Sequence, residues 1–108
     1  MRVLDLCDRI PKTVAGNQIA GQLIRSATSA APNYAEARGA ESRNDFIHKL
    51  GITFKELNES EVWLKMLLER KALPEGELTA VLEECRVLCR IIAASRKTAS
   101  GIPPGTRE

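Results

Sequence analysis

The sequence is poor in aromatic residues and contains no long hydrophobic run. Phe, Trp and Tyr together make up 4% of the 108 residues, whereas helix formers such as Ala, Leu, Glu, Lys and Arg are abundant. No segment sustains the alternation of apolar and polar residues that marks a strand. No stretch reaches the roughly 18 to 20 apolar residues that a membrane-spanning helix needs. We therefore expect an all-α fold and no integral membrane protein.

Cysteine is also scarce, with Cys7, Cys85 and Cys89 as the only three. The number is odd and the N-terminus lacks a long apolar signal region, so we expect a reduced, cytoplasmic protein. Cys85 and Cys89 stand one helical turn apart, which two metal ligands could use. Both also fall on a leucine-rich stripe, and no further Cys or His completes a set of four ligands. We predict that they pack in the core, and we expect no metal or other cofactor.

Strong charge of one sign is missing as well. Sixteen Lys and Arg against fourteen Asp and Glu give a net charge of +2, so any contact with nucleic acid must use a local patch. Five cations near the junction of the second and third predicted helices are candidates for phosphate binding: Arg25, Arg38, Arg43, Lys49 and Lys55. Acidic residues are interleaved with them, and a solvated charged face is the alternative.

Helix breakers divide the chain into four helical segments. They fall at Pro11, near Gly39, and between Pro74 and Gly76, which leaves helices over about residues 2–10, 15–38, 42–71 and 75–98. Ser42 is the expected N-cap of the third helix. Four helices with short connections predict one domain over residues 1–100, an antiparallel up-and-down four-helix bundle, followed by a flexible tail over residues 101–108.

Apolar residues recur at helical spacing in each long segment. The expected core stripe of the second helix is Ala20, Leu23, Ile24, Ala27, Ala31 and Tyr34. That of the third is Phe46, Leu50, Phe54, Leu57, Leu64 and Leu68, and that of the fourth is Leu78, Val81, Leu82, Cys85, Leu88, Cys89 and Ile92. A second side of the third helix carries Ile52, Trp63 and Leu67, which we expect to be covered by other helices or by another subunit. The double-sided helices favour an oligomer.

No catalytic constellation stands out. Ser26, Thr28 and Ser29 lack a base, since the single His48 is expected on the outer side of its helix. Their hydroxyls are instead expected to bond the carbonyls that Pro32, in mid-helix, leaves without a donor. Glutamates, Glu59 among them, are expected to pair with Arg and Lys rather than to act as acid and base. We predict an interhelical or intersubunit polar network of Arg25, Ser29, Asn33, Glu36, Glu56 and Glu61.

One stretch, residues 22–64, carries a recognisable pattern. It contains a Q-L-x-R-S-x-T-S element, an Asn and a Glu-Ala pair, a Ser-x-x-Asp-Phe helix start, and Lys-Glu followed later by Trp-Leu. The residues concerned are Gln22, Leu23, Arg25, Ser26, Thr28, Ser29, Asn33, Glu36, Ala37, Ser42, Asp45, Phe46, Lys55, Glu56, Trp63 and Leu64. On these residues the chain resembles the bacterial four-helix-bundle proteins first known from intervening sequences in 23S ribosomal RNA genes. More distantly, it is similar to the accessory variability proteins of diversity-generating retroelements.

The resemblance implies an antiparallel four-helix bundle that assembles into a homopentamer, with no enzymatic activity and a link to RNA. Pro32 departs from the small residue usual at its place, and the first helix is short. The sequence thus predicts a non-enzymatic cytoplasmic oligomer whose partners are its own copies and RNA or another nucleic acid, with no small-molecule substrate. The alternative is a protein-interaction or structural oligomer with no nucleic-acid role.

Overall fold

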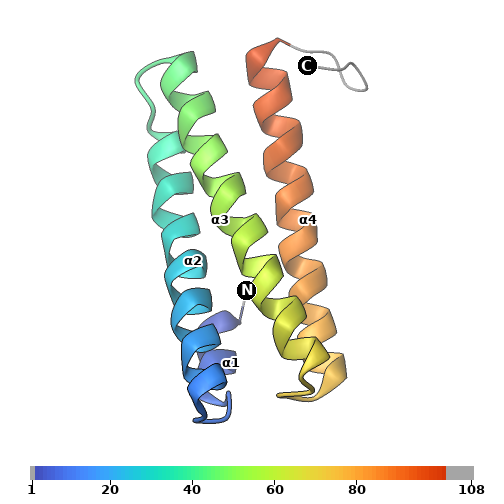
Figure 1. The fold of residues 1–108 in the computed structure, drawn as a ribbon. Coiled ribbons are helices and arrows are strands. Elements are labelled where there is room, and N and C mark those ends of the chain that lie inside the picture. Colours follow the sequence, from blue (N-terminus) through green and yellow to red (C-terminus); the bar gives the residue numbers. More distant parts are fainter. Residues whose placement is uncertain (1, 102–108) are drawn as a thin grey trace.

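The computed structural model describes residues 2–101, which form four helices and no strand. The helices are α1 (Val3–Asp8), α2 (Val14–Arg38), α3 (Arg43–Glu69) and α4 (Glu75–Ser100), shown in Figure 1. The all-α prediction is confirmed. Each end of the four predicted segments lies within two residues of the end of the observed helix. Of the predicted tail, only Gly101 belongs to the described residues, and positions 102–108 lie outside them.

Local chemistry explains where α2, α3 and α4 begin or end. The Thr13 side chain caps α2 by accepting a hydrogen bond from the Gly16 amide at 3.0 Å, and Ser42 caps α3 by accepting from the Asp45 amide at 3.1 Å, as predicted. A Cβ on Gly16 would lie 2.0 Å from the Pro11 carbonyl oxygen, so only glycine fits this turn. Gly101 ends α4 with φ 79°, in the left-handed region that glycine adopts without strain.

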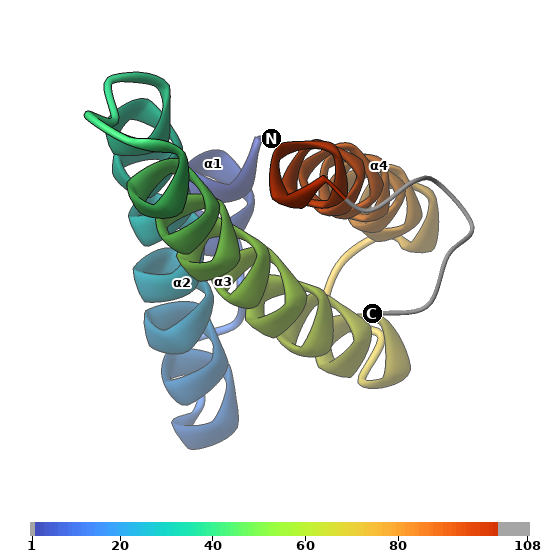
Figure 2. The same ribbon diagram turned by 90° about the horizontal axis from the view of Figure 1, so that it is seen from above.

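The three long helices run antiparallel in succession, with α3 between α2 and α4 (Figures 1 and 2). The short helix α1 packs against α2 and lies partly behind the lower end of α2 in the view of Figure 1. Ion pairs from Arg9 to Glu77 and from Arg2 to Glu84, the latter at 3.6 Å, tie α1 to α4 as well. Because α1 has only six residues, it covers one end of the space between α2 and α4 and leaves the other end open.

The core of α3 and α4 follows the predicted stripes in part, and Phe46, Phe54 and Leu68 of α3 are half-buried where burial was expected. Leu50, Leu57 and Leu64 of α3 are buried as expected, and so are six of the seven stripe residues of α4. Leu67, expected on a second side of α3, is fully buried in the same core. Leu88, expected in the core, is 38% exposed because no helix covers α4 at that level.

The predicted core face of α2 is wrong by part of a turn. Ile24, Ala31 and Tyr34 are exposed, with 42% of Tyr34 accessible. The buried positions are Gly16, Ile19, Leu23, Ser26, Ala30 and Ala37. These positions also fit helical spacing, but they include Ser26, which a pattern of apolar residues does not contain.

Buried hydroxyls form the contact that turns α2 to this face. The Ser26 and Ser60 hydroxyl oxygens lie 2.7 Å apart between α2 and α3, and both side chains are fully buried. The Ser60 hydroxyl donates to the Glu56 carbonyl at 3.0 Å, and it can therefore accept from Ser26. Two small, mutually satisfied side chains let α2 and α3 approach closely.

The helix α2 continues through Pro32, but the hydroxyls do not compensate in the predicted way. Pro32 has no amide hydrogen for the Thr28 carbonyl. The Thr28 hydroxyl donates to a carbonyl further back, that of Ile24 at 2.6 Å, and the carbonyl within reach of the Ser26 hydroxyl is that of Leu23, at 3.3 Å. Thr28 and Pro32 are themselves exposed residues of α2.

Candidate functional site

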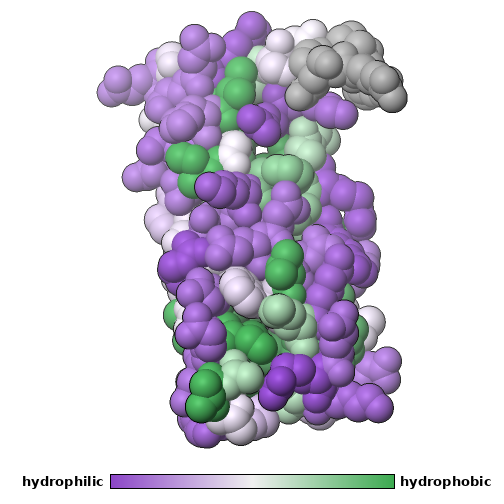
Figure 3. Space-filling model, viewed as in Figure 1, coloured by the Kyte–Doolittle hydropathy of each residue, from purple (hydrophilic) through white to green (hydrophobic). Residues whose placement is uncertain are grey.

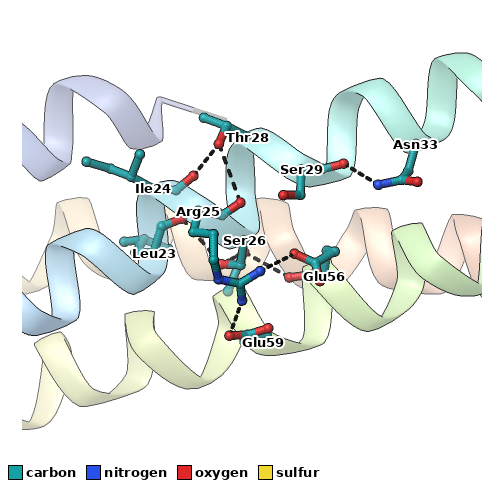
Figure 4. Close-up of polar contacts among 10 residues, drawn as sticks. Leu23, Ile24, Arg25, Ser26, Thr28, Ser29, Asn33, Glu56 and Glu59 are labelled. Carbon is teal, nitrogen blue, oxygen red and sulfur yellow. Dashed lines mark hydrogen bonds and ion pairs between the residues drawn. The ribbon is translucent and has the colours of Figure 1, made fainter.

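The strongest polar cluster joins α2 to α3 at Arg25. Its guanidinium bonds Glu56 at 3.2 Å and also Glu59, one turn along α3 (Figure 4). The hydrogen bond from Arg25 is the main reason why the pKa of the Glu59 carboxyl lies below its usual value, and the same bond raises the pKa of the guanidinium. Sequence reasoning placed Arg25 and Glu56 in the network but left out Glu59. The spacing of Glu56 and Glu59 at i and i+3 could have found it.

The other predicted members of the polar network do not join this cluster. Glu36 pairs with Lys49 at 3.1 Å, further along the same two helices. The Asn33 side-chain amide donates to the Ser29 backbone carbonyl at 2.8 Å within α2 (Figure 4). Within one chain the predicted residues therefore form separate contacts and not a single network, and contacts between subunits stay a prediction.

Glu61 belongs to a third cluster, between α3 and α4. It accepts from Arg86 at 3.1 Å and lies 3.3 Å from the Lys65 ammonium. The hydrogen bond from Arg86 is the first cause of the lowered pKa of the Glu61 carboxyl, and that from Lys65 is the second among those that lower it. The carboxylates thus serve to hold α3 against both neighbours, as the preference of Glu for Arg and Lys predicted.

The five candidate phosphate-binding cations fall into two groups. Arg25 and Lys49 are engaged in ion pairs with glutamates of the neighbouring helix. Arg38, Arg43 and Lys55 are exposed and form no ion pair within residues 2–101. Arg38 ends α2 and Arg43 begins α3, so both stand beside the loop that joins these helices. We call these three residues the free cations.

Trp63 and Ile52, from the second side of α3, are half-buried in this chain. The indole Nε1 of Trp63 is buried and makes no well-formed hydrogen bond, although it lies near enough to Glu59 to help lower the pKa of that carboxyl. Trp63 packs against the core. Trp63 therefore stabilises the packing of the single chain, in addition to any contact that it makes in an assembly.

All three cysteines are buried thiols. Burial raises the pKa of Cys85 to about 12 and that of Cys7 to about 11, and it also raises the pKa of Cys89. The Cys85 thiol donates to the Leu57 carbonyl at 3.2 Å. Their place in the core confirms the packing prediction. Within residues 2–101, His, Cys, Asp and Glu side chains form no group of three that could hold a metal ion.

An apolar groove opens between α2 and α4, beside Val3 and Leu4, where α1 begins. It encloses about 670 Å³. Its floor includes Thr53 and Leu57 of α3, and Val3 and Leu4 of α1 close one end. The walls are formed by Ala27, Thr28, Ala30, Ala31 and Tyr34 of α2 and by Leu88, Ile91 and Ile92 of α4. Three of the residues that the sequence placed in the core, Ala31, Tyr34 and Leu88, are thus half-exposed groove walls.

The opposite side of the molecule has a different character. Figure 3 shows the face on the α3 side, where hydrophilic residues dominate and hydrophobic residues are scattered among them. No helix within residues 2–101 is both long enough and apolar enough to cross a membrane.

These features define a class: an all-helical protein whose three long antiparallel helices are joined by ion pairs and buried hydroxyls. The model of the 23S rRNA-intervening sequence protein family matches residues 1–94, and the chain belongs to that family. It is also similar to a crystal structure from Bacteroides thetaiotaomicron, described as a protein of unknown function from the S23 ribosomal protein family. The two share 29% sequence identity and a TM-score of 0.78, over 89% of each chain. No curated protein matches the sequence.

Proposed function

We propose that this protein is a non-enzymatic, cytoplasmic oligomer, a pentamer of identical chains, that associates with RNA or another nucleic acid. The family to which it belongs takes its name from sequences that interrupt 23S ribosomal RNA. The observation that carries the nucleic-acid part is the set of free cations. Arg38 and Arg43 flank one loop, and all three residues are exposed and form no ion pair among the described residues.

The chemistry of such a surface suits phosphate groups rather than bases. Arginine can bind a phosphate through two parallel N–H bonds, and lysine adds a point charge. With a net charge of only +2, the chain attracts a polyanion through this patch and not through its overall field. Repetition of the patch in an oligomer multiplies the contacts along one strand. Arg25 and Lys49 would contribute less because their charges are already matched by glutamates.

The non-enzymatic part is supported by the state of the hydroxyls and thiols. The Ser26 and Ser60 hydroxyls are buried against each other, and burial holds Cys85 in its protonated form. A nucleophile needs a nearby base and access for substrate, which this packing denies to these side chains. Buried, unpaired thiols are also consistent with a reducing cytoplasm.

The test is binding of a short labelled single-stranded RNA, followed by fluorescence anisotropy over a range of salt concentrations. The triple variant Arg38→Gln/Arg43→Gln/Lys55→Gln is expected to bind more weakly. The slope of log K against log salt should fall by about 2, since each phosphate contact on a single strand contributes about 0.7.

A matched control removes the same charge elsewhere. Lys12, Arg70 and Lys71 are exposed cations at the other end of the helices, and their change to Gln should leave binding almost as in the unmodified protein. Equal losses in both triple variants would show that only net charge matters, and would contradict a site formed by the free cations.

A second candidate function is a protein-interaction or structural oligomer with no nucleic-acid role. The apolar groove favours it, because half-exposed groove walls are suited to a protein surface and not to phosphates. Absence of RNA binding by the unmodified protein at low salt would favour this candidate over the first.

A further inference from the structure

The groove between α2 and α4 leaves large apolar side chains open to solvent. Among its walls, Ile91 is 53% exposed and Tyr34 is 42% exposed, and Leu4 at the α1 end is 57% exposed. A four-helix bundle would cover this space with a fourth long helix, but α1 stops after two turns. Apolar surface concentrated in one hollow favours a partner that brings its own apolar side chains.

The same chain carries a convex apolar feature on the opposite side of α3. Val62 is 51% exposed and Met66 is 43% exposed. At i and i+4 they stand one above the other on the helix, turned away from the buried Leu57 and Leu64. We call this pair the ridge.

The ridge is the best match for the groove within the described residues. The large hydrophobic residues that are exposed outside the groove lining are Val14, Ile24, Val62, Met66 and Val87. Of these, Val62 and Met66 alone are one turn apart on a single helix. Side chains at i and i+4 form the kind of row that inserts between two facing helices. From this we propose that the Val62–Met66 ridge of one copy docks in the α2–α4 groove of a second copy. The inference rests on the oligomer of the proposed function and names the surfaces that build it.

The docking is head-to-tail, because the ridge and the groove are different surfaces. Such a contact repeats from copy to copy and produces a closed ring when the rotation between copies permits, and not a two-fold dimer. A standard interface takes about 800 Å² from each partner. The chain exposes 6748 Å², so one ridge and one groove interface together leave most of the surface for other contacts. Lys55, two turns before Val62 on α3, would lie at the rim of the interface.

The test uses two variants whose changed side chains are all at least 40% exposed, so each should fold. Val62→Glu/Met66→Glu removes the ridge, and Tyr34→Glu/Ile91→Glu removes the groove. Light scattering should give each variant the monomer mass of 11.9 kDa, while circular dichroism stays helical. Mixed in equal amounts, the two variants should form a one-to-one pair, since each retains the surface that the other has lost.

A control variant, Val14→Glu/Thr79→Glu, adds the same charges at exposed positions outside both surfaces and should keep the mass of the unmodified protein. An unmodified oligomer whose mass survives in the ridge and groove variants would overturn the docking but not the oligomer. Monomers that stay separate after mixing would also overturn it. A monomeric unmodified protein would overturn the docking together with the oligomer of the proposed function.

Discussion

The buried Ser26–Ser60 pair allows a quantitative test of how hydroxyl groups hold α2 against α3. Both hydroxyls are fully buried, 2.7 Å apart, and each also has a carbonyl within reach, that of Leu23 for Ser26 and that of Glu56 for Ser60. Replacing either serine by alanine removes the shared hydrogen bond, yet leaves the remaining hydroxyl a carbonyl acceptor. Each single change should therefore lower the free energy of unfolding by about 1 kcal/mol, the usual net value of one hydrogen bond.

The double variant Ser26→Ala/Ser60→Ala should cost clearly less than the sum of the two single variants. The shared bond is counted twice in that sum, and so a coupling of about 0.5 to 1 kcal/mol is expected. Urea unfolding followed by circular dichroism measures it. With a slope of roughly 1 to 3 kcal/mol per molar urea, each single change should move the midpoint by some tenths of a molar unit up to about 1 M.

A larger side chain provides the opposing test. Ser60→Leu places three further carbon atoms where another oxygen lies 2.7 Å away, and overpacking of this kind costs roughly 1 to 3 kcal/mol or more. Strictly additive alanine effects, together with an unchanged midpoint for Ser60→Leu, would refute the close contact of α2 and α3 at this point.

Further predictions concern charge, thiols and glycines. Arg25→Met should make the free energy of unfolding depend less on pH in acid. In the folded protein the hydrogen bond from Arg25 lowers the pKa of the Glu59 carboxyl from 4.5. The stabilisation by this pair is therefore present above pH 4.5 and is lost as the pH falls through the lower pKa of the folded protein. Thermal melts from pH 7 to pH 3 measure this, and parallel curves for both proteins would contradict it. Cys85 should resist a thiol reagent at pH 8 until urea unfolds the chain, because its pKa is about 12; mass spectrometry that finds it labelled in the folded protein within seconds would contradict the burial. Gly51→Ala should raise the melting temperature slightly, since glycine inside a helix costs up to about 1 kcal/mol and the new Cβ meets only a flexible guanidinium at 3.2 Å. Gly16→Ala should lower it, because its Cβ would lie 2.0 Å from a backbone carbonyl oxygen; the reverse order of the two melting temperatures would be evidence against this turn.

Helix positions could be predicted from the sequence because their ends are set by local residues. Pro11, Pro74 and the Ser42 cap act within a few positions of themselves, and the structure places helix ends beside each. The buried stripe of α4 was also predictable, because leucine, valine and cysteine side chains on one side of a helix are buried together by the element that packs there.

The buried face of α2 could not be predicted in the same way. Ser26 counts as polar until its partner is known, and Ser60 lies 34 residues away on another helix. Tyr34 and Leu88 were expected in the core because their spacing continues the apolar stripes of α2 and α4. Their exposure follows from the shortness of α1, which spans only Val3–Asp8.

The candidate site was predictable in its residue types and not in its pairings. The sequence placed Arg25 and Glu56 in one polar network without pairing them. It also could not show that Lys49 and Glu36 form their own pair, or that Glu61 bonds to Arg86 of α4. Consequently the sequence could not separate cations that are already neutralised from the free cations, and that distinction decides which positions are available to phosphate.

The mass of the unmodified protein in solution shows whether identical copies of the chain assemble. Multi-angle light scattering at micromolar concentration should give about 60 kDa, five times the chain mass of 11.9 kDa, if identical copies form the proposed ring. A mass of 11.9 kDa that does not change with concentration would contradict the account, because the exposed groove and ridge would then have no partner in a second copy.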